Sequence, residues 1–214
     1  MAWAAVIGAV AGLSYWARLS GDGAEATDLL FRWVTAIATV VFDGLILLML
    51  LAIARGLPLR DTFALRRPPS WRQASLIALG ALLATYTVSI AEEIFLGHAA
   101  REQAVPQFWD GSRADAFAAN AFAIAVLVPI VEEAACRGLG FRLLERYGQG
   151  VAIVGSAIAF ALAHGAITDL PWVLVTGLGL GFLRSRTGSL YPCVALHAFV
   201  NGVAVLVAAT VAPG

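Results

Sequence analysis

The sequence predicts an all-α fold, a polytopic transmembrane bundle of about seven helices. Of the 214 residues, 60% are hydrophobic and only 13% are charged, whereas about 25% of the residues of a soluble domain are charged. The mean hydropathy is +0.83. Apolar runs recur along the whole chain, and no internal repeat or low-complexity linker divides them. We therefore expect a single integral membrane domain over residues 1–214.

Each apolar run is a candidate membrane span. A helix of about 20 residues crosses the hydrocarbon core; the first, fifth and sixth runs are shorter, so the expected count is about six to eight. The fourth run is expected to continue as an amphipathic helix that stops near the turn at residues 148–150. The runs are residues 2–17, 31–54, 74–96, 117–136, 151–166, 172–183 and 190–211.

The connections between the runs alternate in charge. Arginines gather in the connections after the second, fourth and sixth runs, and acidic residues prevail in the others. Because arginine excess marks the cytoplasmic side, this pattern predicts a cytoplasmic N-terminus and an outward C-terminus. We expect the membrane to be the inner membrane of a bacterial cell. The arginines are Arg55, Arg60, Arg66, Arg67 and Arg72, then Arg142 and Arg146, then Arg184 and Arg186.

Composition also excludes several classes of protein. The formal net charge is zero, so no basic surface for nucleic acid is expected. Cys136 and Cys193 lie in apolar runs and predict neither a disulfide framework nor a thiolate metal site. No basic segment precedes the first run, which we interpret as a retained helix rather than a cleaved signal. Nothing in the sequence indicates an oligomeric state.

Two adjacent carboxylates, Glu132 and Glu133, lie in the fourth apolar run, within Val-Pro-Ile-Val-Glu-Glu-Ala-Ala-Cys-Arg-Gly at 128–138. A carboxylate in hydrocarbon is costly, so an acidic residue there is a candidate functional group. Arg137 follows Glu133 by one helical turn, and the two can pair on one face. Glu132 has no such partner on its own helix.

Two later polar pairs have the same helical spacing. Phe160 with His164 and His197 with Asn201 each share one face of a helix. Glu132 precedes and His164 follows the turn at residue 148 by the same number of residues, so antiparallel helices set them at one depth. A carboxylate that faces an imidazole in a cavity of low dielectric suits general-base activation of water. A second histidine with an amide can supply donors to a developing oxyanion.

In this order the motifs Glu-Glu-x-x-x-Arg, Phe-x-x-x-His and His-x-x-x-Asn resemble those of the CAAX protease and bacteriocin-processing enzyme (CPBP) family, also called the Abi family. The segment 177–197 is also similar to the family's run into its third motif. The resemblance covers about residues 128–202, with a catalytic core expected over about 117–211. Residues 1–116 resemble nothing more specific than a membrane protein.

The resemblance implies a hydrolase, an intramembrane endopeptidase of the CAAX prenyl protease 2-like class that cleaves a membrane-associated peptide or protein. Glu132 would activate water with assistance from His164, and His197 with Asn201 would form the oxyanion hole. We favour metal-independent glutamate catalysis without a cofactor. The alternative is a zinc ion on Glu132, His164 and His197, although the paired-histidine His-Glu-x-x-His motif is absent. The supporting residues would be Glu133, Arg137 and Phe160.

Structural explanations compete for these residues. Glu132 and Glu133 can each form an ion pair with Arg137. His164 can be a core histidine with its hydrogen bonds satisfied, and His197 and Asn201 can form interhelical hydrogen bonds without catalysis. A second acidic pair, Glu92 and Glu93, lies at the outer end of the third run, with His98 beyond it, and is interpreted as interfacial. The glycine spacing at 177 and 181 predicts close packing that brings the sixth run near the site.

Two other functions are compatible with the sequence. One is a non-catalytic membrane immunity or scaffold protein. The other is a proton-coupled transporter with Glu132, His164 and the mid-span Asp43 as its relay, which the absence of an inverted repeat disfavours. Alone, Asp43 can line the cavity or pair with another helix. The substrate, its prenylation and its cleavage site are not specified by the sequence.

Overall fold

The computed structural model describes residues 1–20, 26–96 and 109–210. All secondary structure in this described part is helical, and each of the seven predicted runs corresponds to a helix. The principal helices are α1 (Ala2–Ser20), α2 (Trp33–Ile53), α4 (Trp71–Leu96), α8 (Gln149–Ala163), α9 (Leu170–Thr187) and α10 (Tyr191–Thr210). The predicted all-α membrane bundle is therefore confirmed. Among the described residues, four helices are long and apolar enough to cross a membrane, and α8 and α10 are shorter apolar helices.

The fourth run forms one continuous rod, Gly111–Tyr147, longer than the 117–136 predicted for its apolar part. The expected amphipathic continuation accounts for its end, because Gly148 has φ +114 and leads directly into α8. The rod consists of η3 (Gly111–Arg113), α5 (Ala114–Phe122), η4 (Ala123–Leu127), α6 (Val128–Glu133), η5 (Ala134–Gly140), α7 (Phe141–Leu144) and η6 (Glu145–Tyr147). Two short helices, η1 (Ala26–Phe31) and α3 (Leu59–Thr62), flank α2.

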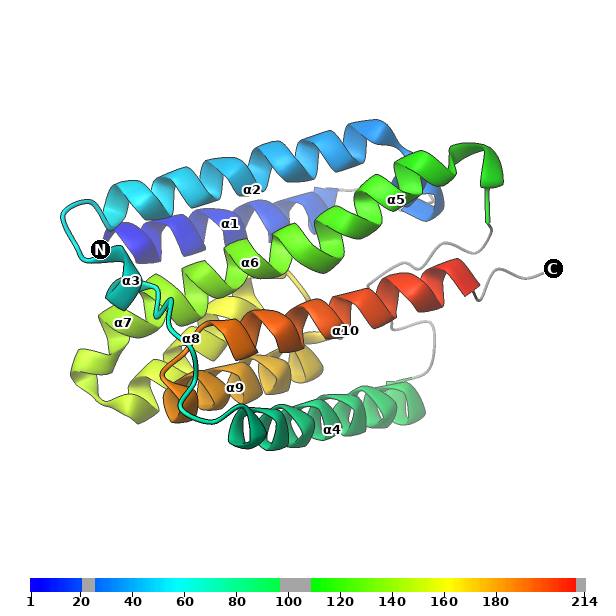
Figure 1. Cartoon of the computed structure of the whole chain (residues 1–214). Coiled ribbons are helices and arrows are strands. Elements are labelled where there is room, and N and C mark those ends of the chain that lie inside the picture. The colour runs from blue at the N-terminus through cyan, green and yellow to red at the C-terminus, as the bar shows by residue number, and fades with distance from the viewer. Residues whose placement is uncertain (21–25, 97–108, 211–214) are drawn as a thin grey trace.

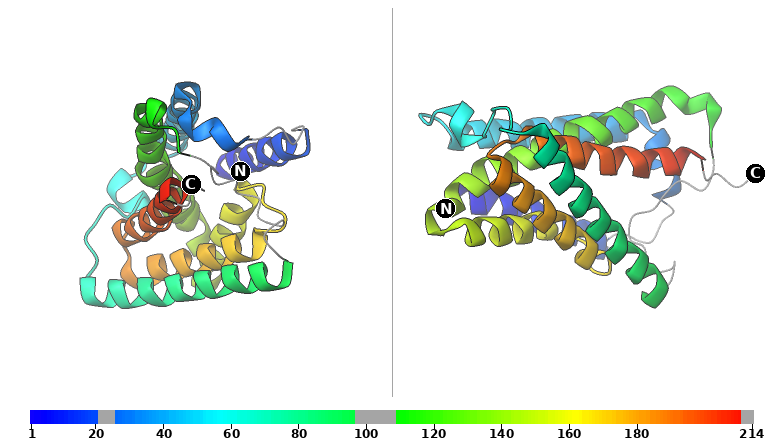
Figure 2. Two further views of the ribbon diagram at one scale, coloured as in Figure 1. Left: turned by 90° about the vertical axis from the view of Figure 1, so that its right-hand side faces the viewer. Right: turned by 60° about the horizontal axis from the view of Figure 1, so that its bottom comes forward.

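The helices pack as two groups that are in contact through α8 and α10 (Figure 1). In one group, α1 and α2 lie beside the long rod; in the other, α9 lies between α8 and α4. α10 contacts η4 and α6 on one side and α9 and α4 on the other. Figure 2 shows α4 along the outside of the second group. This arrangement places α6, α8, α9 and α10 around a common interior.

Apolar side chains cover the outside of the long helices. Val34, Ile37 and Leu48 of α2 and Leu76 and Leu83 of α4 are all more than half exposed. Contiguous exposed apolar surface of this kind is unfavourable in water and is typical of a lipid contact. The chain is an integral membrane protein, and the bilayer covers these faces.

The arginine-rich connections lie together at one end of the bundle, where α1 begins (Figure 1). The connection between α2 and α4 contacts the turn between α9 and α10: the Leu190 amide donates to the Ala64 carbonyl at 3.0 Å, and Arg66 Nε donates to the Gly188 carbonyl at 3.0 Å. The clustering agrees with the alternation of charge in the sequence. Assignment of this end to the cytoplasm remains a prediction.

Three glycines let α9 approach its neighbours closely. A Cβ on Gly177 would lie 3.1 Å from the Ala157 Cα of α8. A Cβ on Gly179 would lie 2.7 Å from the Ala81 Cβ of α4. Gly181 is similarly close to α8. The predicted close packing of this segment is confirmed, and it brings the α9 backbone to the interior of the bundle.

We predict that Gly177→Val destabilises the protein by about 1–3 kcal/mol, because the added side chain must separate α8 from α9. The measurement is the midpoint of thermal or denaturant unfolding in detergent. Gly80→Val on α4 is the matched control, since nothing lies within 4 Å of a Cβ at that position. Equal midpoints for the two variants would contradict the packing argument.

Candidate functional site

The candidate site is built on α6, which carries both Glu132 and Glu133 between two π-helical segments, η4 and η5. π-helical turns are often found at functional sites, and their widened turns change the pairing of backbone carbonyls. Side chains from two other helices donate hydrogen bonds to backbone carbonyls of these segments. Asn201 Nδ2 of α10 donates to the Ile124 carbonyl at 3.0 Å, and Arg184 Nε of α9 donates to the Arg137 carbonyl at 3.0 Å. α9 and α10 therefore fix the helix on both sides of the acidic pair.

Glu133 is the centre of a fully buried polar cluster. Its Oε1 accepts from Arg137 Nη1 at 3.0 Å and contacts His197 Nδ1 at 3.0 Å. Arg137 Nη2 donates to the Gly177 carbonyl at 2.8 Å, and its guanidinium lies 4.4 Å from the centre of the Phe160 ring. The side chains of Glu133 and Arg137 are 0% exposed. The predicted pairing of these two residues is confirmed, and His197 is a further partner that the sequence did not indicate.

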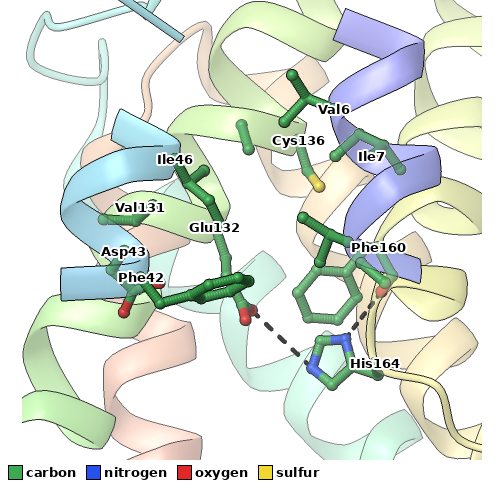
Figure 3. A pocket seen from close by; sticks show the side chains of 13 residues that line it. Val6, Ile7, Phe42, Asp43, Ile46, Val131, Glu132, Cys136, Phe160 and His164 are labelled. Carbon is green, nitrogen blue, oxygen red and sulfur yellow. Dashed lines mark hydrogen bonds and ion pairs between the residues drawn. The ribbon is translucent and has the colours of Figure 1, made fainter. Parts of the chain in front are cut away.

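Glu132 points to the other side of α6, into a cavity beside α8. Its Oε2 lies 3.9 Å from His164 Nε2 and 3.8 Å from His197 Nε2. These separations are longer than a hydrogen bond, and the carboxylate attracts either imidazole only when that ring is protonated. Figure 3 shows the carboxylate facing the His164 ring across the cavity. The approach of Glu132 to His164 agrees with their equal distance from the turn at residue 148.

The hydrogen bonds of the two imidazoles fix where their protons lie. His164 Nδ1 is 2.8 Å from the Phe160 carbonyl, which can only accept, so this nitrogen carries a hydrogen. His197 Nδ1 is 3.0 Å from a carboxylate oxygen of Glu133 and donates in the same way. When the rings are neutral, each Nε2 is therefore unprotonated and carries a lone pair. Both Nε2 atoms lie near the Glu132 carboxylate. Either Nε2 becomes a donor when its ring is protonated.

Phe160 is packed between the polar groups of the site. Its ring centre lies 4.4 Å from that of His164 and 5.4 Å from that of His197. The Phe160 ring thus packs against both imidazoles and against the Arg137 guanidinium. Asn201 lies one turn beyond His197 on α10; the bond to Ile124 uses one of its two amide hydrogens.

The cavity holds a further acidic residue that the sequence left unassigned. Asp43 of α2 is 4% exposed and lines the cavity together with Glu132 and His164. The remaining lining is almost entirely apolar, and the volume is about 60 Å³, enough for a few water molecules. The signal in the sequence was a single acid within an apolar run, which does not reveal which helix it faces.

The sequence pattern placed Arg184 in a connection between two helices, and the structure shows that this was wrong. Arg184 belongs to α9, is 5% exposed and stacks 4.9 Å from the centre of the Phe141 ring. Glu92 also has a definite partner: its Oε1 accepts from the Trp172 amide at 3.1 Å, in the first turn of α9. A carboxylate at the N-terminus of a helix interacts favourably with the helix dipole. His98 lies outside the described residues.

The zinc alternative depends on Glu132, His164 and His197. A carboxylate and two imidazoles are ligand types that zinc accepts. Within the described residues, however, no group of three or more His, Cys, Asp or Glu side chains is arranged as a metal site. The zinc alternative remains a prediction, and the mechanism that we favour uses the protein groups alone.

Comparison with protein families identifies the C-terminal part of the chain. Residues 114–203 match the model described as type II CAAX prenyl endopeptidase Rce1-like. The match extends from α5 into α10 and contains the three motifs, whereas Asp43 lies outside it. It confirms the resemblance on which the sequence interpretation depended. Comparison with curated proteins and with solved structures gave no match.

We predict that Arg137→Met destabilises the protein by about 3–5 kcal/mol, because it leaves the buried Glu133 carboxylate without its cation. Unfolding in detergent measures the effect. Arg142→Met is the control, since that arginine is half exposed and pairs with Glu145 at the surface. A loss no larger than that of the control would show that the buried pair contributes little to stability.

Proposed function

Since the match of residues 114–203 supports membership of the CPBP family, we propose that the chain is an intramembrane endopeptidase. It hydrolyses a peptide bond of a membrane-associated peptide or protein with a water activated by Glu132. The observation that carries this proposal is the convergence of the Glu132 carboxylate and two imidazole Nε2 atoms beside a cavity with room for water. The proposed location is the bacterial inner membrane, with the N-terminus in the cytoplasm.

The first step is attack by water. Glu132 is part-exposed to the cavity and takes a proton from a water molecule as the oxygen bonds to the scissile carbonyl carbon. The His164 Nε2 lone pair accepts a second hydrogen of this water and orients it. Because the Phe160 carbonyl and ring hold the imidazole, this orientation needs no further rearrangement.

The second group stabilises the oxyanion. His197 can donate from Nε2 only as an imidazolium, because Nδ1 already carries the hydrogen bonded to Glu133. The Glu133 carboxylate supports that positive charge. The second amide hydrogen of Asn201 is the other donor in this proposal. Preorganised donors of this type contribute strongly to acyl-transfer catalysis.

Collapse of the tetrahedral intermediate breaks the C–N bond. The proton taken from water passes from Glu132 to the leaving nitrogen, directly or through His164, so the amine leaves neutral and the carboxylate is restored. A substrate with a prenylated CAAX terminus is the class that the family description names. Bacteriocin maturation, self-immunity and trimming of surface proteins are further biological roles that are compatible with this proposal.

We predict that Glu132→Gln lowers kcat by about 10²–10⁴-fold, because the amide cannot accept a proton. The assay is cleavage of a membrane protein that accumulates uncleaved in cells lacking this protein, identified by comparing their membrane proteome with that of the wild type. Glu145→Gln, at the end of the long rod and away from the cavity, is the control. Full proteolytic activity of a folded Glu132→Gln protein would refute the mechanism.

We also predict that the purified protein keeps its activity after dialysis against a zinc chelator, since the proposed base and donors are protein groups. Activity is compared before dialysis, after dialysis and after zinc is restored. A loss that zinc alone reverses would establish the zinc alternative on Glu132, His164 and His197.

A further inference from the structure

Asp43 has an environment that the proposed chemistry does not explain. It lies in the middle of α2, outside the residues that match the family, and is 4% exposed. Within the described part of the chain, its Oδ2 has no hydrogen-bond partner. A buried carboxylate without a partner destabilises a folded protein. A residue of this kind in a cavity is expected to serve a ligand.

The polar atoms around the cavity are complementary to a hydrogen-bond donor. Asp43 Oδ2 and Glu132 Oε2 are both buried without a hydrogen bond, and the neutral His164 ring presents an Nε2 lone pair. Apart from the weak donor Cys136, the other side chains that line the cavity are apolar. An occupant must therefore bring N–H or O–H groups and be otherwise apolar.

A peptide with apolar side chains has this chemistry, because every residue except proline carries a main-chain N–H. Asp43 and Glu132 come from different helices, α2 and α6, and line the same cavity (Figure 3). A peptide whose scissile carbonyl is attacked beside Glu132 can present a neighbouring N–H to Asp43. The side chains of Ile7, Phe42 and Ile46 surround that position with apolar surface.

We propose that Asp43 is a substrate-positioning residue that accepts a hydrogen bond from a main-chain N–H of the peptide next to the scissile bond. The inference rests on the proposed endopeptidase function and assigns a residue outside the matched region to substrate binding. The ligand would thus supply the hydrogen bond that Oδ2 lacks within the described part of the chain.

Two variants separate this role from a structural one. Asp43→Leu removes the charge and the acceptor, and Asp43→Asn keeps a carbonyl acceptor of similar shape. Because no internal hydrogen bond of Oδ2 is lost, both variants should unfold at a temperature equal to or above that of the wild type. Asp61→Asn is the control, an exposed carboxylate of α3 far from the cavity.

The kinetic test uses an internally quenched peptide with a farnesylated CAAX terminus or, where that probe is not cleaved, the protein that accumulates uncleaved in cells lacking this protein. Asp43→Leu should raise KM about tenfold, the loss expected for one hydrogen bond to a charged group. Asp43→Asn should raise KM less, and kcat should change little in either variant.

A lower unfolding temperature for Asp43→Leu, or an unchanged KM, would overturn the inference. An equal collapse of kcat in both variants would also overturn it, because that result assigns Asp43 to proton transfer. The proposed function fails separately: a fully active Glu132→Gln protein beside a raised KM in Asp43→Leu would refute the role of Glu132 and retain that of Asp43.

Discussion

The structure of the site depends on the burial of one charge, the carboxylate of Glu133. A buried carboxylate is tolerated only with close partners, and here both partners meet the same oxygen: Arg137 from its own helix and His197 from α10. Arg137 in turn reaches the Gly177 carbonyl of α9. The hydrogen bonds that compensate this one buried charge therefore connect the long rod to α9 and α10. The close approach of the α9 glycines makes this reach possible.

The two adjacent glutamates have different tasks because neighbouring residues of a helix face different directions. Glu133 points to the buried interior, where its Oε1 is bonded to Arg137 and His197. Glu132 points to the cavity, where its Oε2 has no hydrogen bond and its side chain is 33% exposed. The same turn of helix thus presents an immobilised charge and the carboxylate that we propose as the base. His197 lies between them: its Nδ1 is 3.0 Å from the Glu133 carboxylate, and its Nε2 is 3.8 Å from the Glu132 carboxylate.

The positions of the helices were largely predictable, because apolar runs and helix-ending glycines act locally. The pairing of Glu133 with Arg137 and the approach of Glu132 to His164 were predictable for the same reason: the first needs helical spacing and the second a short hairpin. The bond from His197 to Glu133 and the cavity position of Asp43 were not predictable, because each depends on how distant helices rotate about their axes. Arg184 was misplaced in a connection, since its burial follows from contacts with Arg137 and Phe141 across helices.

The cavity combines two parts of the chain that differ in their relation to known families. The proposed base and its imidazoles lie within residues 114–203, whereas part of the cavity wall comes from α1 and α2, which precede that match. Val6, Ile7, Phe42 and Ile46 set the shape of this wall, and Asp43 is its charged group. A reaction at a peptide bond requires the same groups for every substrate, but recognition depends on the surface that the substrate contacts. We therefore expect substrate selectivity to be determined by α1 and α2, through side chains that can vary without disturbing the buried cluster around Glu133.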